Sequence, residues 1–275
     1  MNPVIIAVLV MLVVAAIVFA AIGAAARNRE RLSALANWAA ANGFQFSEGD
    51  PYNLDGRFNN IADIGRGHAR YAYEVLSRSD PVPIWMFRYQ YRTWETRTVT
   101  DSNGNTRTET YEETHYRSYL IVELQAAFPK LFIRPENFFD KMAGFVGFDD
   151  INFESEEFSR RFYCKSDNRE FAYAVIHPQM MEWMLSLGAS HLRFEGQLGD
   201  GLFISDITKM PERPEAKQAA LAMAAGFINR IPPFVWQDDG KRDAVKLPEP
   251  NAPVAPGSLG AAGDSQRDLS RVKQV

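Results

Sequence analysis

The sequence begins with an apolar run that contains no charged side chain from Met1 to Ala26. A helix needs about 20 apolar residues to cross the hydrocarbon core of a bilayer, and residues 3–26 exceed that length. A cleaved signal peptide normally has a basic segment before a shorter apolar core. We therefore predict an uncleaved transmembrane anchor over 1–26, with residues 3–26 in contact with the lipid bilayer. The small residues of AIGAAA (21–26) imitate a cleavage site, so a secreted product is the alternative.

Three arginines, Arg27, Arg29 and Arg31, follow the apolar run directly. Positive charge next to a membrane helix favours the cytoplasmic side, which predicts a single-pass protein of the plasma membrane with its globular domain in the cytoplasm. We expect these arginines to contact lipid headgroups, at about 1 kcal/mol each. Residues 27–43 are predicted to continue as a juxtamembrane helix that ends at Gly43 and packs an apolar stripe on the domain, formed by Leu32, Leu35, Ala36 and Ala39.

Composition narrows the possible partners. The formal net charge is -4 and the pI is about 5.7, whereas nucleic-acid-binding domains are usually basic, so no nucleic acid is expected. The single cysteine excludes an intramolecular disulfide. One globular domain over 44–236 fits the length of 275 residues. No aromatic residue follows Trp236, and residues 237–275 are predicted to be a disordered tail.

Two long alternating segments, Ile84–Thr100 and Thr106–Leu124, predict a hairpin because Asn103-Gly104 accepts the backbone angles of a tight turn. The polar part of the hairpin (95–113) should project into solvent. Residues 119–124 are apolar on both faces and predict a central strand. One face of the first strand is aromatic and is expected to be core: Trp85, Phe87, Tyr89 and Tyr91. Further strands are predicted over 69–76, 131–133, 191–194 and 202–207, and helices over 137–146 and 211–229.

The stretch 153–184 is interpreted as a strand, a turn and a broken helix. Alternation predicts a strand over 158–165, and Asp167 with Glu170 has the spacing of a helix capping box. Pro178 should stop the helix near His177 and restart it, and Gly188 should end the second piece. These elements together predict an α+β fold, a mostly antiparallel sheet with packed helices preceded by one transmembrane helix.

Several motifs, in this order and spacing, resemble a family of uncharacterised single-pass, membrane-anchored bacterial proteins common in actinobacteria. They are LANWAAANGFQF (35–46), GRFNNIADIGRGHARYAYEVLS (56–77), FRYQY (87–91), EEFSRRFYCKSDNREFAYAVIHPQMMEWML (156–185) and INRIPPFVW (228–236). The resemblance covers the region after the apolar run. It implies the membrane anchor and the fold, and it implies no activity or catalytic residues.

No linear motif of catalysis, phosphate binding or metal binding is present. Cys164 and His177 form the one Cys–His combination, but Cys164 should be buried and His177 should make a structural hydrogen bond. The other histidines, His68, His115 and His191, lie in separate segments without ligand spacing. Two further features are interpreted as ordinary surface structure: Gly65–Arg70 as a turn before a strand, and the acidic residues of 149–157 as a charged loop. We predict no catalytic, cofactor or metal residues, and no cofactor.

The leading hypothesis is a non-enzymatic, membrane-anchored module that binds a protein or the lipid surface. Two alternatives stay open: a hydrolase whose site is assembled from scattered residues, and an extracytoplasmic binding domain. A binding module needs an exposed apolar or aromatic patch, for which Thr93–Thr114 is the candidate. An enzyme needs a pocket with convergent polar groups.

Overall fold

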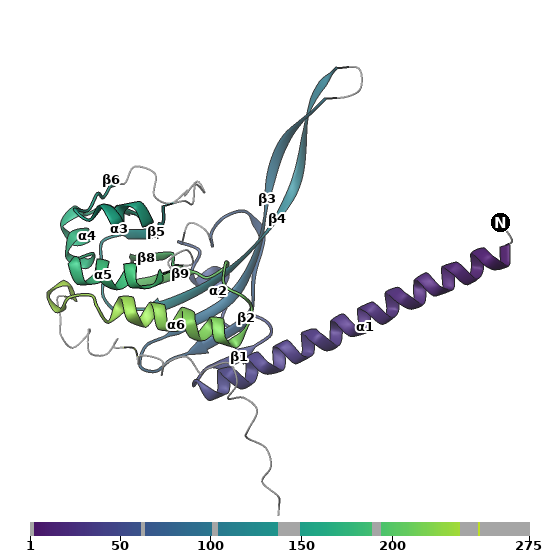
Figure 1. Ribbon diagram of the computed structural model, residues 1–275, viewed down its shortest axis with the longest axis horizontal. Helices are drawn as coiled ribbons and strands as arrows, with labels where there is room; N and C mark the ends of the chain where they lie inside the picture. The colour runs from purple at the N-terminus through teal and green to yellow at the C-terminus, as the bar shows by residue number, and fades with distance from the viewer. Residues whose placement is uncertain are drawn as a thin grey trace, which may run out of the picture.

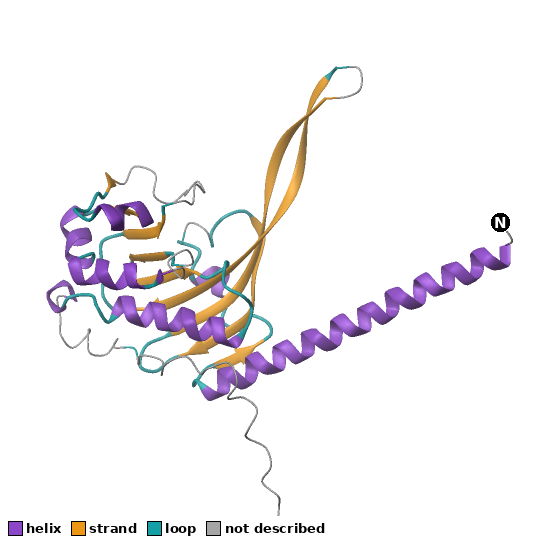
Figure 2. Ribbon diagram, in the orientation of Figure 1, coloured by secondary structure: helices purple, strands orange, loops and turns teal. Residues whose placement is uncertain are grey.

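The computed structural model describes residues 3–61, 64–100, 104–136, 149–188, 194–236 and Leu247. One nine-stranded antiparallel sheet organises the fold, with strand order β1-β2-β3-β4-β9-β8-β5-β7-β6. Figure 1 shows α5 and α6 lying across the sheet, and Figure 2 shows the same layers by secondary structure. The predicted α+β class is confirmed.

The strands are β1 Gln45–Ser47, β2 His68–Arg78, β3 Ile84–Thr100, β4 Thr106–Glu123, β5 Leu131–Pro135, β6 Asp149–Asp150, β7 Phe162–Ser166, β8 Gly196–Gly199 and β9 Leu202–Asp206. The helices are α1 Pro3–Ala41, α2 Leu54–Arg57, α3 Glu156–Arg161, α4 Arg169–Val175, α5 Pro178–Ser186 and α6 Pro214–Ile228, with a 3-10 helix, η2, at Pro233–Trp236.

The helix α1 is continuous, so the predicted anchor and juxtamembrane segments form one rod. It is long and apolar enough to cross a membrane, with a mean hydropathy of 3.3 in its most apolar window, and none of that window is buried. At 1.5 Å per residue, its 39 residues extend about 58 Å. Its last turns pack on the domain, where Leu35 and Ala39 join the core. Gly43 then takes a left-handed φ of 73° and ends the helix.

Each face of the sheet buries its own hydrophobic cluster. On the helix-covered face, Met86, Leu120 and Val122 pack with α4, α5 and α6. On the opposite face, the predicted aromatic stripe of β3 is buried beneath the segment that contains α2, including Leu54 and Phe58. Strand β4 lies between β3 and β9 and contributes to both clusters. The predictions of a buried stripe and a central strand are therefore confirmed.

Hydrogen bonds from Tyr89 hold the segment before β2 against the hydrophobic cluster on the face opposite the helices. The Tyr89 hydroxyl donates to the Asp55 carboxylate and lies 2.6 Å from the Ile64 carbonyl oxygen. Burial and the bond to Asp55 raise the pKa of Tyr89. Gly67 has φ 71°, and a Cβ there would lie 2.2 Å from the Arg92 carbonyl oxygen. The glycines of this turn therefore allow close packing. The predicted turn before a strand is confirmed for residues 65–67, and β2 begins at His68.

The first part of the predicted strand 158–165 is wrong, because residues 156–161 form helix α3. Ser155 caps it by accepting a hydrogen bond from the Phe158 N–H at 3.2 Å. Acidic residues occupy its first turn and basic residues its last, which suits the helix dipole. The predicted cap of the next helix is also wrong. Asn168 accepts from the Phe171 N–H at 2.9 Å, while Asp167 accepts from the Lys130 N–H.

The predicted helix break is confirmed, since α4 ends at Val175 and α5 begins at Pro178. His177 makes the expected structural contact, with Nε2 3.1 Å from the Arg230 carbonyl oxygen. Cys164 is buried, and burial raises the pKa of its thiol. Gly188 follows α5 with φ 55°.

Some boundaries differ from the predictions or lie outside the described residues. The strand before β9 is Gly196–Gly199 rather than 191–194, of which 191–193 are not described. The predicted helix 137–146 lies outside the described residues. The predicted tail 237–275 also lies outside them, with the exception of Leu247. Leu247 is buried, and its main chain forms hydrogen bonds of 2.9 and 3.2 Å with the Asn229 side chain. Helix α6 begins at Pro214 rather than Pro211.

Gly226→Ala should destabilise the protein, although alanine is the better helix former. A Cβ at Gly226 would lie 2.5 Å from Cζ2 of Trp183, whose ring also contacts Arg230 and Phe194. Overpacking of this kind costs about 1–3 kcal/mol, measurable by chemical denaturation of the detergent-solubilised chain. Gly49→Ala is the matched control, because nothing lies within 4 Å of its Cβ position. Equal effects of both substitutions would contradict this prediction.

Candidate interaction site

The end of the hairpin β3/β4 projects beyond the rest of the sheet (Figure 1). Pairing of β3 with β2 ends at His68↔Arg92, and pairing of β4 with β9 ends at Tyr119↔Asp206. Beyond these points the two strands pair only with each other among the described strands, out to Thr100↔Thr106. We call Thr93–Thr114 the arm. Its predicted projection into solvent is confirmed for its described residues.

The helix-covered face of the sheet continues past α6 into an exposed aromatic surface at the base of the arm. Register places Tyr71 and Tyr116 on either side of Gln90, in one row across three strands. Trp94, on the same face, has 63% of its surface exposed, Tyr116 56% and Tyr71 48%. We call this surface the aromatic face, formed by Tyr71, Tyr73, Trp94 and Tyr116.

Contacts within the aromatic face hold its rings in place. The Tyr71 hydroxyl donates to Oε1 of Gln90 at 2.9 Å, and the Tyr73 ring lies against the Arg88 guanidinium at 4.9 Å. At the arm, the Trp94 ring stacks on His68 with centroids 5.4 Å apart. The face is therefore a preformed surface of aromatic rings, with polar groups among them.

A charge network joins α1 to the sheet beside the aromatic face. The Arg31 guanidinium donates to both carboxylate oxygens of Glu74, at 2.6 and 2.7 Å. Arg88 approaches the same carboxylate at 3.2 Å and Glu212 at 3.6 Å, and Lys217 approaches Glu212 at 3.1 Å. Five charged side chains from α1, β2, β3 and the start of α6 thus form one alternating chain.

Glu74 is the centre of this network. Its side chain is only 10% exposed, and it occupies a bulge of β2 with a left-handed φ of 51°. Burial opposes ionisation, but the hydrogen bond from Arg31 and the positive charge of Arg88 outweigh it, so the pKa of Glu74 is lowered. The ionised carboxylate is therefore the form that ties α1 to the sheet.

The three arginines predicted to contact lipid headgroups fall into two groups. Arg27 and Arg29 are exposed on α1, so lipid contact stays a prediction for them. Arg31 lies against Glu74 within the protein. Sequence reasoning missed this role because the partners are 43 residues apart.

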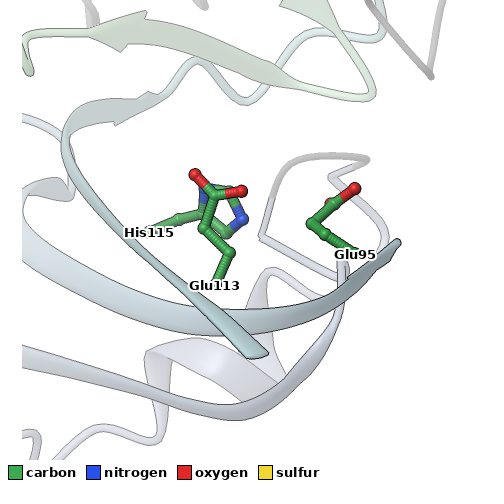
Figure 3. Close-up of side chains that lie close together, drawn as sticks. All are labelled: Glu95, Glu113 and His115. Atoms are coloured by element: carbon green, nitrogen blue, oxygen red, sulfur yellow. The ribbon is translucent and has the colours of Figure 1, made fainter. Parts of the chain in front are cut away.

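On the opposite face of the arm, a histidine and two glutamates come together. One ligand atom each from Glu95, Glu113 and His115 lies within 4.8 Å of the others, as Figure 3 shows. In the sequence, His115 has no ligand spacing to the other histidines. A signal is nevertheless present in the alternation Glu113-x-His115, which puts both side chains on one face of a strand.

The fold and these surfaces define an α+β domain preceded by a candidate membrane helix and carrying a projecting hairpin. No protein-family profile and no curated protein matches the sequence. Among solved structures, the chain is similar to the crystal structure of the mycobacterial trehalose monomycolate transport factor A, TtfA. Sequence identity is 11% and the TM-score 0.47, over 80% of this chain and 98% of that one. At these values the likeness carries neither a family nor a function to this chain.

Replacing Glu74 with glutamine should destabilise the domain. It should also make the free energy of unfolding depend less on pH in the acid range. Because the folded-state pKa is lowered, the carboxylate contributes fully above its ordinary pKa of about 4.3, and the contribution is lost as the pH falls through the folded value. Above pH 5 we expect the substitution to lower the free energy of unfolding by about 2 kcal/mol. This is less than the cost of breaking a fully buried ion pair, because Arg31 and Arg88 are partly exposed and keep part of their hydration. Unfolding of both proteins from pH 3 to 7 tests this. If the stability of Glu74→Gln varied with pH as that of the wild-type protein does, this prediction would be contradicted.

Proposed function

We propose that this protein is a membrane-tethered, non-enzymatic module whose aromatic face and arm bind a protein partner with a basic surface. The observation that carries the proposal is the exposed aromatic face. Protein interfaces are enriched in tyrosine, tryptophan and arginine, and the rings that dominate binding lie amid polar groups. Tyr116 and Trp94 have this setting, beside Gln90 and Arg92.

The charge of the arm favours a protein over the lipid surface as the occupant. From Thr93 to Thr114 the sequence has two arginines against four glutamates and one aspartate, a formal net charge of about -3. Anionic headgroups attract basic segments and would repel this one. A basic protein surface is complementary to it, and such complementarity speeds association and excludes wrong partners.

We further infer that the domain lies on the cytoplasmic side of the plasma membrane. The support is the exposed pair Arg27 and Arg29, directly after the apolar part of α1. The chain then comprises an anchor (1–26), a juxtamembrane segment (27–43), a globular domain (44–236) and a tail (237–275). Arg27 and Arg29 contact lipid headgroups in this arrangement, while Arg31 fixes the domain to the helix.

Site-specific photo-crosslinking in the cells that make the protein tests the partner. A photoreactive phenylalanine analogue at Tyr116 or Trp94 should yield one discrete protein adduct, because both side chains face outward. The same analogue at Phe234, which is 75% exposed and lies in η2, is the matched control and should not yield it. Mass spectrometry identifies the captured protein.

Binding of the purified partner to the full chain then separates recognition from chance proximity. Trp94→Ala with Tyr116→Ala should weaken binding by about 2 kcal/mol or more, the loss typical of buried aromatic contacts. Phe234→Ala should leave it unchanged, and added salt should slow association. Crosslinks only to lipid, or equal binding by all variants, would overturn the proposal.

Protease treatment tests the proposed topology. With an epitope added after Val275, the tag should survive protease in intact cells and be lost once the cytoplasm is opened, because the positive charges favour the inner side. A tag exposed at the periplasmic face of the membrane serves as the control for protease action. Loss of the epitope in intact cells would place the domain outside the cytoplasm and contradict this assignment.

A further inference from the structure

We propose that Glu95, Glu113 and His115 form a binding site for a divalent transition-metal cation such as Zn²⁺. The site lies at the base of the arm, on the opposite face from Trp94 and Tyr116. It rests on a separate set of residues and does not depend on the proposed partner binding.

Strand geometry brings the three side chains together. Glu113 and His115 are two residues apart on β4 and therefore share a face. In the register, Glu113 is opposite Thr93 and His115 is opposite Tyr91, which places Glu95 on the same face one step along β3. Figure 3 shows all three side chains rising from the same side of the hairpin.

The three ligand atoms are near the spacing that one ion requires. They lie within 4.8 Å of one another. Zinc bonds to nitrogen and oxygen of about 2.0–2.2 Å in a tetrahedral site put neighbouring ligands roughly 3.4 Å apart. Rotation about the side-chain bonds of the glutamates covers this difference without moving the strands, because Glu113 is exposed and Glu95 half-exposed.

The charge around the site favours a cation. Among the described glutamates of the arm, Glu109 is paired with Arg97 and Arg107, and Glu112 with Arg92 and His68. Neither Glu95 nor Glu113 has an ion pair with any described residue. The two carboxylates left without a counter-charge are thus the two beside His115. Like charges held this close repel each other, and a bound divalent cation removes that repulsion.

The histidine is already oriented. Its ring stacks on buried Tyr91, with centroids 4.8 Å apart and planes 22° apart. Nε2 of His115 lies 2.7 Å from the Thr93 hydroxyl, which donates to Oε1 of Glu95 at 2.9 Å. Thr93 thus links two of the ligands. Metal-bound histidines commonly bond to such a neighbouring group, which fixes the orientation of the ring, and Thr93 is placed to do this for His115.

The donor set indicates the class of metal. An imidazole with two carboxylates suits Zn²⁺, Co²⁺, Mn²⁺ or Fe²⁺, whereas Ca²⁺ and Mg²⁺ prefer all-oxygen sites. Three protein ligands leave a position for water or for a ligand from another molecule. The ion would join β3 to β4 at the point where the arm leaves the body, and so brace the arm.

Titration of the tag-free, detergent-solubilised full chain with Co²⁺ alone tests the site. Bound Co²⁺ in a site with fewer than six ligands gives strong visible absorption, which should saturate at one ion per chain and be displaced by Zn²⁺. His115→Ala and Glu113→Gln should each abolish this saturable band. Thr93→Val should weaken binding by about 10- to 100-fold, as expected for loss of an orienting contact.

The other face of the arm offers a matched control. His68 and Glu112 are the same residue types, 3.0 Å apart, but Glu112 is already paired with Arg92. His68→Ala and Glu112→Gln should therefore leave the Co²⁺ band unchanged. Circular dichroism of every variant should show that the fold is retained, because the altered side chains are partly or fully exposed.

Three results would overturn the proposal. They are the absence of saturable Co²⁺ binding to the wild-type chain, a band that persists in both His115→Ala and Glu113→Gln, and a band lost equally in His68→Ala. If His115→Ala fails to fold, Glu113→Gln alone decides the outcome, because a Glu-to-Gln change keeps size and shape.

Discussion

The fold depends on the pairing of β3 with β4, a ladder unbroken from Ile84↔Val122 to Thr100↔Thr106. Inside the body, both faces of this ladder are buried, by the helices on one side and by the segment around α2 on the other. The same ladder then leaves the body as the arm. Because the side chains alternate strictly along both strands, the two faces of the core continue as two chemically different faces of the arm. One carries exposed aromatic rings and the other the histidine and its glutamates.

The second constraint is the way α1, the candidate membrane helix, meets the sheet. Leu35 and Ala39 supply a small apolar contact, and the Arg31–Glu74 pair adds a charged one. Glu74 also holds Arg88, which reaches Glu212 just before α6. A single carboxylate in a bulge of β2 therefore coordinates the helix, the sheet and the covering layer. Loss of its charge would leave Arg31 without the partner of its described ion pair, and Arg88 with Glu212 alone.

The sequence predicted the long elements well because their signals are repeated many times. Two-residue alternation over β3 and β4, with Asn-Gly between them, located both strands within a residue at each end. Pro178 located the helix break because proline lacks the N–H that the helix would need, and its ring clashes with the preceding turn. Helix α3 was missed for an equally physical reason. Phe158 and Phe162 are four residues apart, which fits one face of a strand and one face of a helix equally well.

The candidate sites were harder to predict, since they join residues distant in the sequence. Glu74, Arg88 and Glu212 become neighbours only through the bulge in β2 and the position of α6. Glu95 joins His115 only through the register of the hairpin. The alternation and the Asn-Gly turn predict the hairpin, but which residues of the arm face each other depends on the exact register of the two strands. Exposure of Tyr71 and Tyr116 likewise depends on where α6 begins over the sheet, which composition does not encode.

The unbroken course of α1 has a mechanical consequence. A membrane helix longer than the local hydrocarbon layer tilts to bury its apolar length, on average by about 20°. Here α1 runs without a break from its apolar part to the part docked on the domain. If α1 spans a bilayer, any tilt would therefore turn the whole domain with it. The arm, which projects far from the docking point (Figure 1), would then rise or fall relative to the membrane surface. Bilayer thickness would then set the distance between the aromatic face and the membrane surface.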